Sequence, residues 1–162
     1  MNMKKTANLV LNFAIKRLAE IFGIVIFLAG SLLFISLLTY SPDDPNFIFP
    51  KNTAIKNLLG FQGSFVSDLF FQSVGLIAYL ISSTIIITGI NIFRIKEFFL
   101  IIENIFFAII YSILGTFFLT HFYTEAFTLY INGNGGFIGS YLDKTFLNSL
   151  ISINEKIFYY VF

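Results

Sequence analysis

The sequence predicts an all-α membrane protein, a polytopic bundle of transmembrane helices. Hydrophobic residues make up 57% of the chain and charged residues only 12%, and the mean hydropathy is +0.84. Soluble domains carry about 25% charged residues, so a shortage of this size means that lipid surrounds much of the chain. Three long stretches contain no Asp, Glu, Lys or Arg. In lipid each must be helical, because only a helix satisfies its own backbone polar groups.

The predicted spans are residues 21–40, 69–93 and 104–122, and crossing a hydrocarbon core takes about 20 apolar residues. A further apolar run, residues 157–162, follows Glu155 and Lys156 and is too short to cross. It either lies along the interface or begins a fourth span, from about residue 155, that this chain does not complete; we favour the second interpretation. The predicted domains are a basic tail, residues 1–20, and a transmembrane domain, residues 21–162.

The distribution of Lys and Arg predicts that the N-terminus lies on the cytoplasmic side of the membrane. One side of the spans carries Lys4, Lys5, Lys16, Arg17, Arg94 and Lys96, and the other carries Lys51, Lys56 and Lys144. A secretory signal peptide fits poorly, because the first apolar run exceeds the roughly 7 to 15 residues of a signal's hydrophobic region. The residues that follow it, Thr39-Tyr40-Ser41-Pro42, also lack a small-residue cleavage site.

Both outer loops are predicted to contain short amphipathic helices on the membrane surface. After the first span, Pro42 and Pro45 fix turns and two carboxylates favour water; residues 53–66 then regain helical apolar spacing. After the third span, the glycine-rich turn 132–136 precedes a partly amphipathic segment, residues 137–153.

Small residues recur at helical spacing within the spans. They are Gly23 and Gly30 in the first span, Gly75, Ser82 and Gly89 in the second, and Ala108, Ser112 and Thr116 in the third. Such stripes let membrane helices approach closely. They could also line a substrate path, but we favour helix contacts.

No nucleotide site is visible in the sequence. The phosphate-binding pattern G-x-x-x-x-G-K-[ST] is absent, and the glycines of 133–139 lack the preceding strand that a dinucleotide loop needs. The chain has no Cys, which excludes disulfides, thiolate metal sites and a Cys nucleophile. Nor do its basic residues gather into the patch that nucleic-acid binding requires. We therefore predict a non-enzymatic chain without cofactor or metal.

The remaining titratable residues near the spans have simple interpretations. His121 and Glu125 are four residues apart, but a catalytic zinc site normally takes three protein ligands, so an interfacial pair is favoured. Glu103 could serve a proton relay, yet its place near the boundary favours a surface ion pair with Arg94 or Lys96. The first two spans contain no ionisable Asp, Glu, Lys, Arg or His, which disfavours an ion-coupled transporter.

Three local motifs resemble the N-terminal four-helix membrane domain of the bacterial FtsK/SpoIIIE family of DNA translocases. The first is an outer turn of the form Tyr-Ser-x-x-Asp-Pro, and the second joins glycines and an Asp to a following helix that contains Gly-x-x-Ala-Tyr. The third is a glycine-rich turn after the third helix. The matching residues are Tyr40, Ser41, Asp44 and Pro45; Asn57, Gly60, Gly63, Ser64, Ser67, Asp68, Gly75, Ala78 and Tyr79; and Gly135, Gly136 and Gly139. The resemblance covers nearly the whole chain from Leu18 onward.

The resemblance implies a membrane anchor and protein-interaction region of a cell-division translocase, holding a chromosome-segregation motor at the division septum. The implied partners are membrane lipid, other division membrane proteins and further copies of the full-length protein, with no direct nucleic-acid binding by this chain. Two departures stand out: Ser82 and Ser83 follow the Ala-Tyr pair where the family often has Pro, and only three spans are complete. The alternative is a stand-alone small membrane protein, such as a transporter or channel subunit.

Overall fold

The computed structural model describes residues 3–45, 54–123 and 132–145. These residues form five helices and no strand: α1 (Met3–Leu38), α2 (Gly60–Val74), α3 (Ile77–Ile95), α4 (Phe99–Phe122) and α5 (Gly136–Asp143). Three stretches are long and apolar enough to cross a membrane, namely Ala7–Leu38 within α1, Ile77–Ile95 and Phe99–Phe122. The predicted all-α helical membrane fold is confirmed.

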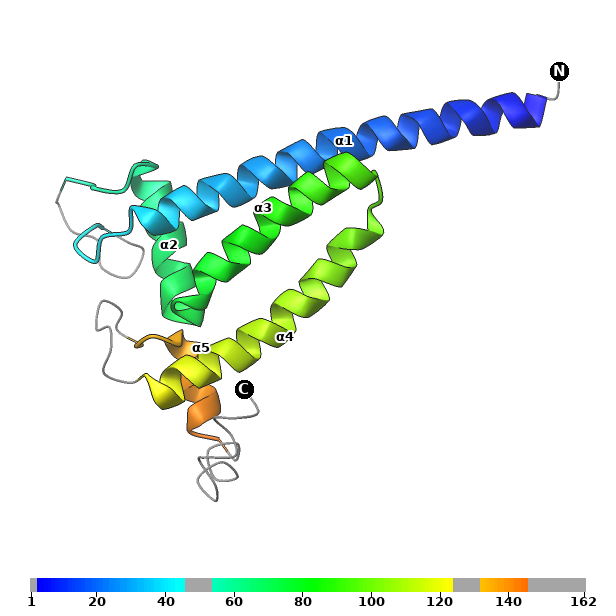
Figure 1. Cartoon of the computed structure of the whole chain (residues 1–162). Coiled ribbons are helices and arrows are strands. Elements are labelled where there is room, and N and C mark those ends of the chain that lie inside the picture. Colours follow the sequence, from blue (N-terminus) through cyan, green and yellow to red (C-terminus); the bar gives the residue numbers. More distant parts are fainter. Residues whose placement is uncertain (1–2, 46–53, 124–131, 146–162) are drawn as a thin grey trace.

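The helices form an open bundle with two distinct ends (Figure 1). Helix α3 runs antiparallel beside α1, and α4 returns from the end of α3 along a diverging path. The short helices α2 and α5 lie at the end of the bundle where α1 finishes, which we call the loop end. The opposite end, where α3 turns into α4, is called the charged end.

Helix α1 starts well before the predicted first span, 21–40, because it begins at Met3 and ends at Leu38. No Gly or Pro occurs in the sequence before Gly23, so nothing interrupts the helix through the predicted basic tail. Its C-terminal end follows the prediction closely, since Pro42 cannot continue a helix and restricts the residue before it.

The predicted second span, 69–93, is not one helix in the structure. Helix α2 ends at Val74, and Gly75 adopts φ 58° and ψ −139° before α3 begins at Ile77. Such a backbone conformation is open almost only to glycine. The Leu76 N–H released by the break donates to the carbonyl oxygen of Asn134 at 2.9 Å. Residues 69–74 therefore belong to the short loop-end helix α2, and the membrane-crossing helix begins after the break.

The third predicted span, 104–122, corresponds to α4, which ends at Phe122 as expected and starts earlier, at Phe99. The turn before it is tight because Lys96 adopts a left-handed φ of 66° and its N–H donates to the Ile92 carbonyl at 2.8 Å. Helix α5 forms the first part of the predicted segment 137–153. The rest of that segment and the predicted start of a fourth span near residue 155 lie outside the described residues.

Helices α1 and α3 cross with their backbones in contact. A methyl group added at Gly23 would lie 2.7 Å from the backbone nitrogen of Phe93, and one at Gly30 would lie 2.8 Å from that of Ile86. A methyl group at Gly89 would overlap the backbone of Phe27. The predicted packing role of these three glycines is confirmed.

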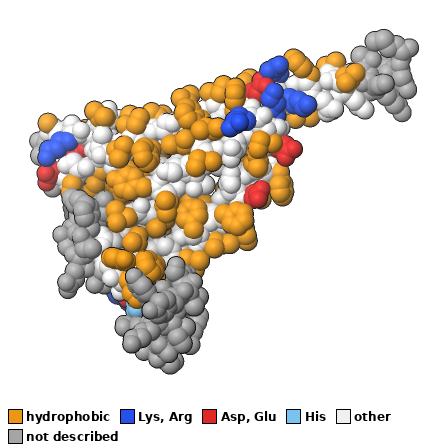
Figure 2. All heavy atoms as spheres, in the orientation of Figure 1, with side chains coloured by type: hydrophobic (Ala, Val, Ile, Leu, Met, Phe, Trp, Pro, Cys, Tyr) orange, Lys and Arg blue, Asp and Glu red, His pale blue; other side chains and the backbone are white. Residues whose placement is uncertain are grey.

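The surface is apolar along the helices, and charges gather toward the two ends (Figure 2). At the charged end, the Glu20 carboxylate accepts from Arg17 and pairs with Lys96 at 2.7 Å, which ties α1 to the end of α3. Lys96 therefore pairs with Glu20 and not, as predicted, with Glu103, whose exposed side chain enters no ion pair among the described residues. Near the loop end, Leu37, Phe71, Val74, Ile77 and Ala78 form the buried apolar core.

Candidate functional site: a polar cluster at the loop end

Asp44 organises the connection between α1 and α2. One of its carboxylate oxygens accepts the backbone N–H of Lys56 at 2.9 Å, and the other accepts that of Asn57 at 2.8 Å. Its side chain is almost completely buried, with the residue only 3% exposed. A carboxylate that accepts two backbone donors at such a site fixes the path of the chain, because removing it would leave both donors unsatisfied. Asp44 of the first motif thus connects the turn after α1 to Asn57, where the second motif begins.

Asn57 closes the end of α1. Its side-chain amide nitrogen donates to the carbonyl oxygens of Ser36 and Thr39 at 2.9 and 3.3 Å, and its side-chain oxygen accepts the N–H of Leu59 at 3.0 Å. The last carbonyls of a helix have no partner within it, so this amide supplies what the helix end lacks. Gly63 makes room for Asn57, since a methyl group there would overlap the amide oxygen.

Serine hydroxyls connect α2 to the residues before and after the turn that follows α1. Ser64 donates to the Pro45 carbonyl at 3.0 Å, and Ser36 of α1 donates to the Gly63 carbonyl at 2.6 Å. Ser67 donates to the same Gly63 carbonyl at 2.8 Å. These bonds are buried, so they lock α2 against the end of α1 and exclude water between them.

Tyrosines connect this polar layer to the apolar core beneath it. The Tyr40 hydroxyl donates to Asp68 at 3.1 Å, and the Tyr79 hydroxyl donates to the Leu37 carbonyl at 3.2 Å. Phe71 lies between them, with ring centroids 4.9 Å from Tyr40 and 5.5 Å from Tyr79. Each tyrosine therefore places its ring in the core and its hydroxyl on a polar partner.

The third motif packs against the break between α2 and α3. A methyl group added at Gly75 would overlap the carbonyl group of Asn134, and one at Gly136 would lie 2.6 Å from the Gly75 nitrogen. On the other side, Gly135 and Gly139 lie directly against the backbone of Thr116 in α4. The glycine turn is thus the piece that holds α4 to the rest of the loop end.

All the predicted motif residues fall within the described part of the chain and meet in this one region, which we call the loop-end cluster. Its members are Tyr40, Ser41, Asp44, Pro45, Asn57, Gly60, Gly63, Ser64, Ser67, Asp68, Gly75, Ala78, Tyr79, Gly135, Gly136 and Gly139. Three residues that the sequence analysis did not assign to the site, Ser36, Asn134 and Thr116, complete it. Ser36 is one of the few polar residues of the first span, a signal that could have identified it.

His121 lies at the edge of the cluster and pairs with Asp143 of α5. Its Nδ1 atom is 2.9 Å from the carboxylate, and its ring stacks on Phe117 at 5.7 Å. Glu125, the predicted partner, lies outside the described residues. The described residues contain no group of three His, Cys, Asp or Glu that could hold a metal. Among the described residues, the polar groups of this arrangement satisfy helix ends and connect helices.

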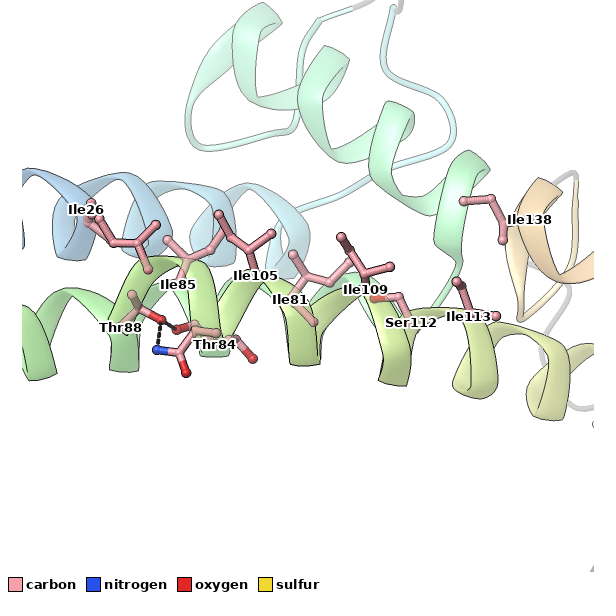
Figure 3. A pocket seen from close by; sticks show the side chains of 13 residues that line it. Ile26, Ile81, Thr84, Ile85, Thr88, Ile105, Ile109, Ser112, Ile113 and Ile138 are labelled. Carbon is pink, nitrogen blue, oxygen red and sulfur yellow. Dashed lines mark hydrogen bonds between the residues drawn. The ribbon is translucent and has the colours of Figure 1, made fainter. Parts of the chain in front are cut away.

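An apolar groove of about 660 Å³ separates α4 from α3 along the middle of the bundle (Figure 3). Isoleucines dominate its walls, among them Ile81 and Ile85 of α3 and Ile105 and Ile109 of α4. Two hydrogen bonds cross between the helices: Asn104 donates to Thr88 at 2.8 Å, and the Thr84 and Tyr111 hydroxyls are 2.8 Å apart.

Comparison with known proteins places this architecture in a family. The family described as the 4TM region of DNA translocase FtsK/SpoIIIE matches residues 15–158. Proteins named DNA translocase FtsK are similar to the chain: that of Rickettsia typhi is 26% identical over 78% of this chain, and that of Caulobacter vibrioides is 31% identical over 43%. That of Rickettsia prowazekii is 30% identical over 43%.

The chain spans only a small part of these relatives, with the matches covering 17%, 8% and 9% of their lengths in the same order. No solved structure matches the chain. The family match covers most of the chain and includes the whole loop-end cluster together with the three candidate membrane spans apart from the N-terminal part of α1. The chain belongs to the family of the membrane-spanning 4TM region of FtsK/SpoIIIE DNA translocases.

Proposed function

We propose that the chain is the membrane-anchoring and protein-interaction region of a cell-division DNA translocase, and that it tethers a chromosome-segregation motor to the division septum. The observation that carries the proposal is the family match over residues 15–158, which coincides with three apolar helices and their connecting loops. In this proposal the chain acts through its location and its contacts.

The chemistry of the loop-end cluster supports a role without catalysis. Phosphoryl transfer needs groups that bind phosphate and Mg²⁺. The carboxylate of Asp44 and the amide of Asn57 are instead bonded to backbone groups of α1 and the α1–α2 connection. We propose that ATP hydrolysis and DNA movement belong to other parts of the translocase.

We further propose that the chain lies in the bacterial inner membrane with the charged end at the cytoplasm and the loop end outside. Arg17, Arg94 and Lys96 lie at the charged end, and the usual excess of Lys and Arg on the cytoplasmic side supports this orientation. These residues flank the membrane, so any contact with DNA would be weak and salt-sensitive.

The loop-end surface is the proposed contact for other division membrane proteins. Its interior is fastened by hydrogen bonds, while Leu58 and Phe61 stay 75% and 50% exposed on its outside. A rigid support with protruding apolar side chains suits recognition by another protein. Further copies of the full-length translocase are the second proposed class of partner.

The anchoring proposal is tested by exchanging this region in the full-length translocase for an unrelated bundle with the same number of spans. We expect the motor to stay in the membrane fraction but to lose septal enrichment of a fluorescent fusion. A matched variant, Leu58→Ser with Phe61→Ser, should keep membrane insertion and reduce septal enrichment. Normal septal localisation of the exchanged protein would disprove the proposal, and so would ATPase activity of the purified chain that a substitution in it abolishes.

The orientation is tested by labelling single cysteines with an impermeant thiol reagent, since the natural chain has none. We expect Lys56→Cys to be labelled from outside in cells with a permeabilised outer membrane, and Lys96→Cys to be labelled only after lysis. Labelling of position 96 alone would reverse the orientation.

A further inference from the structure

The short helix α2 lies level with the last turn of α1. Near the start of α2, the Gly63 carbonyl accepts the Ser36 hydroxyl at 2.6 Å, and near its end Phe71 packs with Leu37 in the buried core. Both ends of α2 are thus held at one height, so the helix runs across the end of the bundle (Figure 1). Ser36 follows the ion-paired Glu20 along the unbroken helix α1, at a distance of roughly 24 Å for a rise of about 1.5 Å per residue.

Helix α5 begins at nearly the same height beside α4. A methyl group added at Gly139 would overlap the carbonyl oxygen of Thr116, so the first turn of α5 lies directly against this part of α4. Thr116 is roughly 26 Å from Phe99, where α4 starts at the charged end. The contact of the His121 ring with the Asp143 carboxylate holds the other end of α5 about 8 Å further along α4.

These heights place α2 and the first turn of α5 at the membrane boundary of the loop end. The hydrocarbon core of a bilayer is about 30 Å thick, and charged side chains are costly within it. The ion pair between Glu20 and Lys96 therefore marks the core boundary at the charged end. At roughly 24 to 26 Å along the helices from that end, α2 and the start of α5 lie just inside the opposite boundary. Any tilt of α1 or α4 shortens these heights and brings both helices deeper.

Both helices turn polar or small residues inward and apolar residues outward. The exposed residues of α2 are Phe61, Gln62, Phe65 and Leu69. Asp68, the only charged residue of α2, is buried on the opposite side together with two serines. In α5, Phe137 and Tyr141 are 61% and 63% exposed, and their rings stack on each other. A helix at a water-facing surface shows the reverse pattern, with its polar side outward, so this arrangement suits apolar surroundings.

The irregular backbone at this depth finds its partners within the protein. The break at Gly75 frees the Leu76 N–H, which donates to the Asn134 carbonyl at 2.9 Å. The carbonyls of Ser36 and Thr39 at the end of α1 accept the side-chain amide of Asn57. Non-helical backbone is tolerated at membrane depth only where protein covers it. The loop-end cluster supplies such cover for these groups.

We propose that the outward side chains of α2 and α5 bind the lipid of the leaflet at the loop end, where acyl chains meet headgroups. They are Phe65, Leu69, Phe137 and Tyr141, which we call the boundary face. The face adjoins α4, a candidate membrane span whose side chains are mostly exposed, so it continues a surface that lipid already covers. Tyrosine suits this junction because its ring is apolar and its hydroxyl reaches the headgroups. The exposed ion pair of Asp43 and Lys56 belongs to the water side of the loop end. The proposal requires membrane insertion but neither septal localisation nor a particular orientation.

Spin labels on single cysteines test the proposal, because the natural chain has no Cys. In phosphatidylcholine vesicles oxygen concentrates in the lipid and a nickel chelate stays in water, so the ratio of their collision rates with the label reports its depth. We expect this oxygen-to-nickel ratio to be several-fold higher for Leu69→Cys and Phe137→Cys than for Lys56→Cys. Ile87→Cys is the matched deep reference, because Ile87 is 55% exposed near the middle of α3 and Leu69 is 53% exposed.

Two results of this experiment would overturn the proposal. Ratios at positions 69 and 137 as low as the ratio at position 56 would mean that water covers the boundary face. Low collision rates with both reagents would mean that protein covers it.

A second measurement uses tryptophan fluorescence, since the natural chain has no Trp either. Phosphatidylcholine that carries bromine near the headgroup end of its acyl chains should quench Tyr141→Trp several-fold more than Asp43→Trp. Asp43 is the matched control, because its side chain is similarly exposed but forms an ion pair on the water side. Equal quenching of the two variants would overturn the proposal. Loss of septal localisation with lipid contact intact at position 141 would count against the proposed function alone.

Discussion

Helix α3 has two long neighbours and contacts them by different means. Toward α1 it offers Gly89, and the two backbones touch at Gly23 and Gly30. Toward α4 it presents isoleucines across an open groove, and the polar links are the hydrogen bond that Thr88 accepts from Asn104 and the one between the Thr84 and Tyr111 hydroxyls. The first contact is continuous and close, whereas the second is wide.

This difference shows that α4 is positioned chiefly at its ends. Lipid is as apolar as the side chains of a helix, so helices in a membrane gain stability from close packing and hydrogen bonds. Helix α1 gains stability from close packing along its length. Helix α4 is held at one end by the short turn after α3 and at the other by the glycines that contact Thr116. The loop-end cluster is therefore expected to matter more for α4 than the groove does.

The sharpest test of this comparison is Gly75→Ala. A side chain at this position must adopt φ 58° and also overlap the Asn134 carbonyl group, so we expect a loss of about 4 kcal/mol in unfolding free energy. Gly60→Ala is the matched control: its φ is 67°, but no atom lies within 4 Å of the added methyl group, so only the backbone strain of about 1 kcal/mol remains.

Steric trapping in lipid or bicelles would measure both unfolding free energies. Cross-linking of cysteines on α3 and α4 should weaken in Gly75→Ala, while cross-linking of α1 to α3 stays. Equal effects of the two glycine substitutions would contradict the role of the Asn134 contact in holding α4.

The attachment of α1 is tested at its loop end by Asp44→Ala. The substitution leaves the buried N–H of Asn57 and the partly buried N–H of Lys56 without acceptors, and we expect it to cost about 3 kcal/mol of unfolding free energy. Asp43→Ala, one residue earlier, removes an exposed ion pair with Lys56 and should cost less than about 1 kcal/mol. The same unfolding measurement compares them, and similar losses would show that burial of Asp44 is unimportant.

The contacts of α3 with α1 and with α4 are compared by two substitutions, Gly89→Ala in α3 and Gly115→Ala in α4. The methyl group at position 89 meets the backbone of Phe27, which can move only if the helices separate, so we expect a loss of about 2 kcal/mol. At position 115 of α4 it meets the end of the Ile77 side chain at 2.6 Å, which can rotate away at small cost. A larger loss for Gly115→Ala would reverse the comparison.

The smallest expected effect concerns the hydrogen bond between Thr88 and Asn104. A double-mutant cycle with Thr88→Val and Asn104→Leu should give a coupling of about 0.6 kcal/mol, the average for such bonds between membrane helices. Unfolding free energies of the four variants provide the coupling. A value above about 2 kcal/mol would mean that this bond, and not the ends of α4, holds the helix in place.

Hydropathy located the membrane-crossing helices well but could not place their limits. The apolar run that ends at Tyr40 identified the loop end of α1, while its start at Met3 depends on the absence of helix breakers. The break at Gly75 was invisible for another reason: the residues on both sides of it are equally apolar. Its conformation depends on Asn134, which lies 59 residues further along the chain and supplies the acceptor for Leu76.

The motif spacing in the sequence did not indicate how the motif residues meet in the structure. The burial of Asp44 contradicts the simple expectation that a loop carboxylate faces water, because its partners are backbone groups that any sequence would provide. The ion pair of Glu20 with Lys96 and the contact of the His121 ring with the Asp143 carboxylate join different helices. Sequence spacing identifies neighbours within one helix, so partners of this kind emerge only once the helices are placed.

The unbroken length of α1 has a mechanical consequence. Near its C-terminal end, the Asn57 amide holds the Ser36 carbonyl and thereby sets the azimuth of the helix about its own axis. An α-helix is stiff in torsion over this distance because each turn is bonded to the next. The direction in which Leu11 points, roughly 38 Å away along the axis, is thus set from the far side of the membrane. If a partner rotated the loop end of α1 by a small angle about the helix axis, the other end of α1 would rotate by a similar angle.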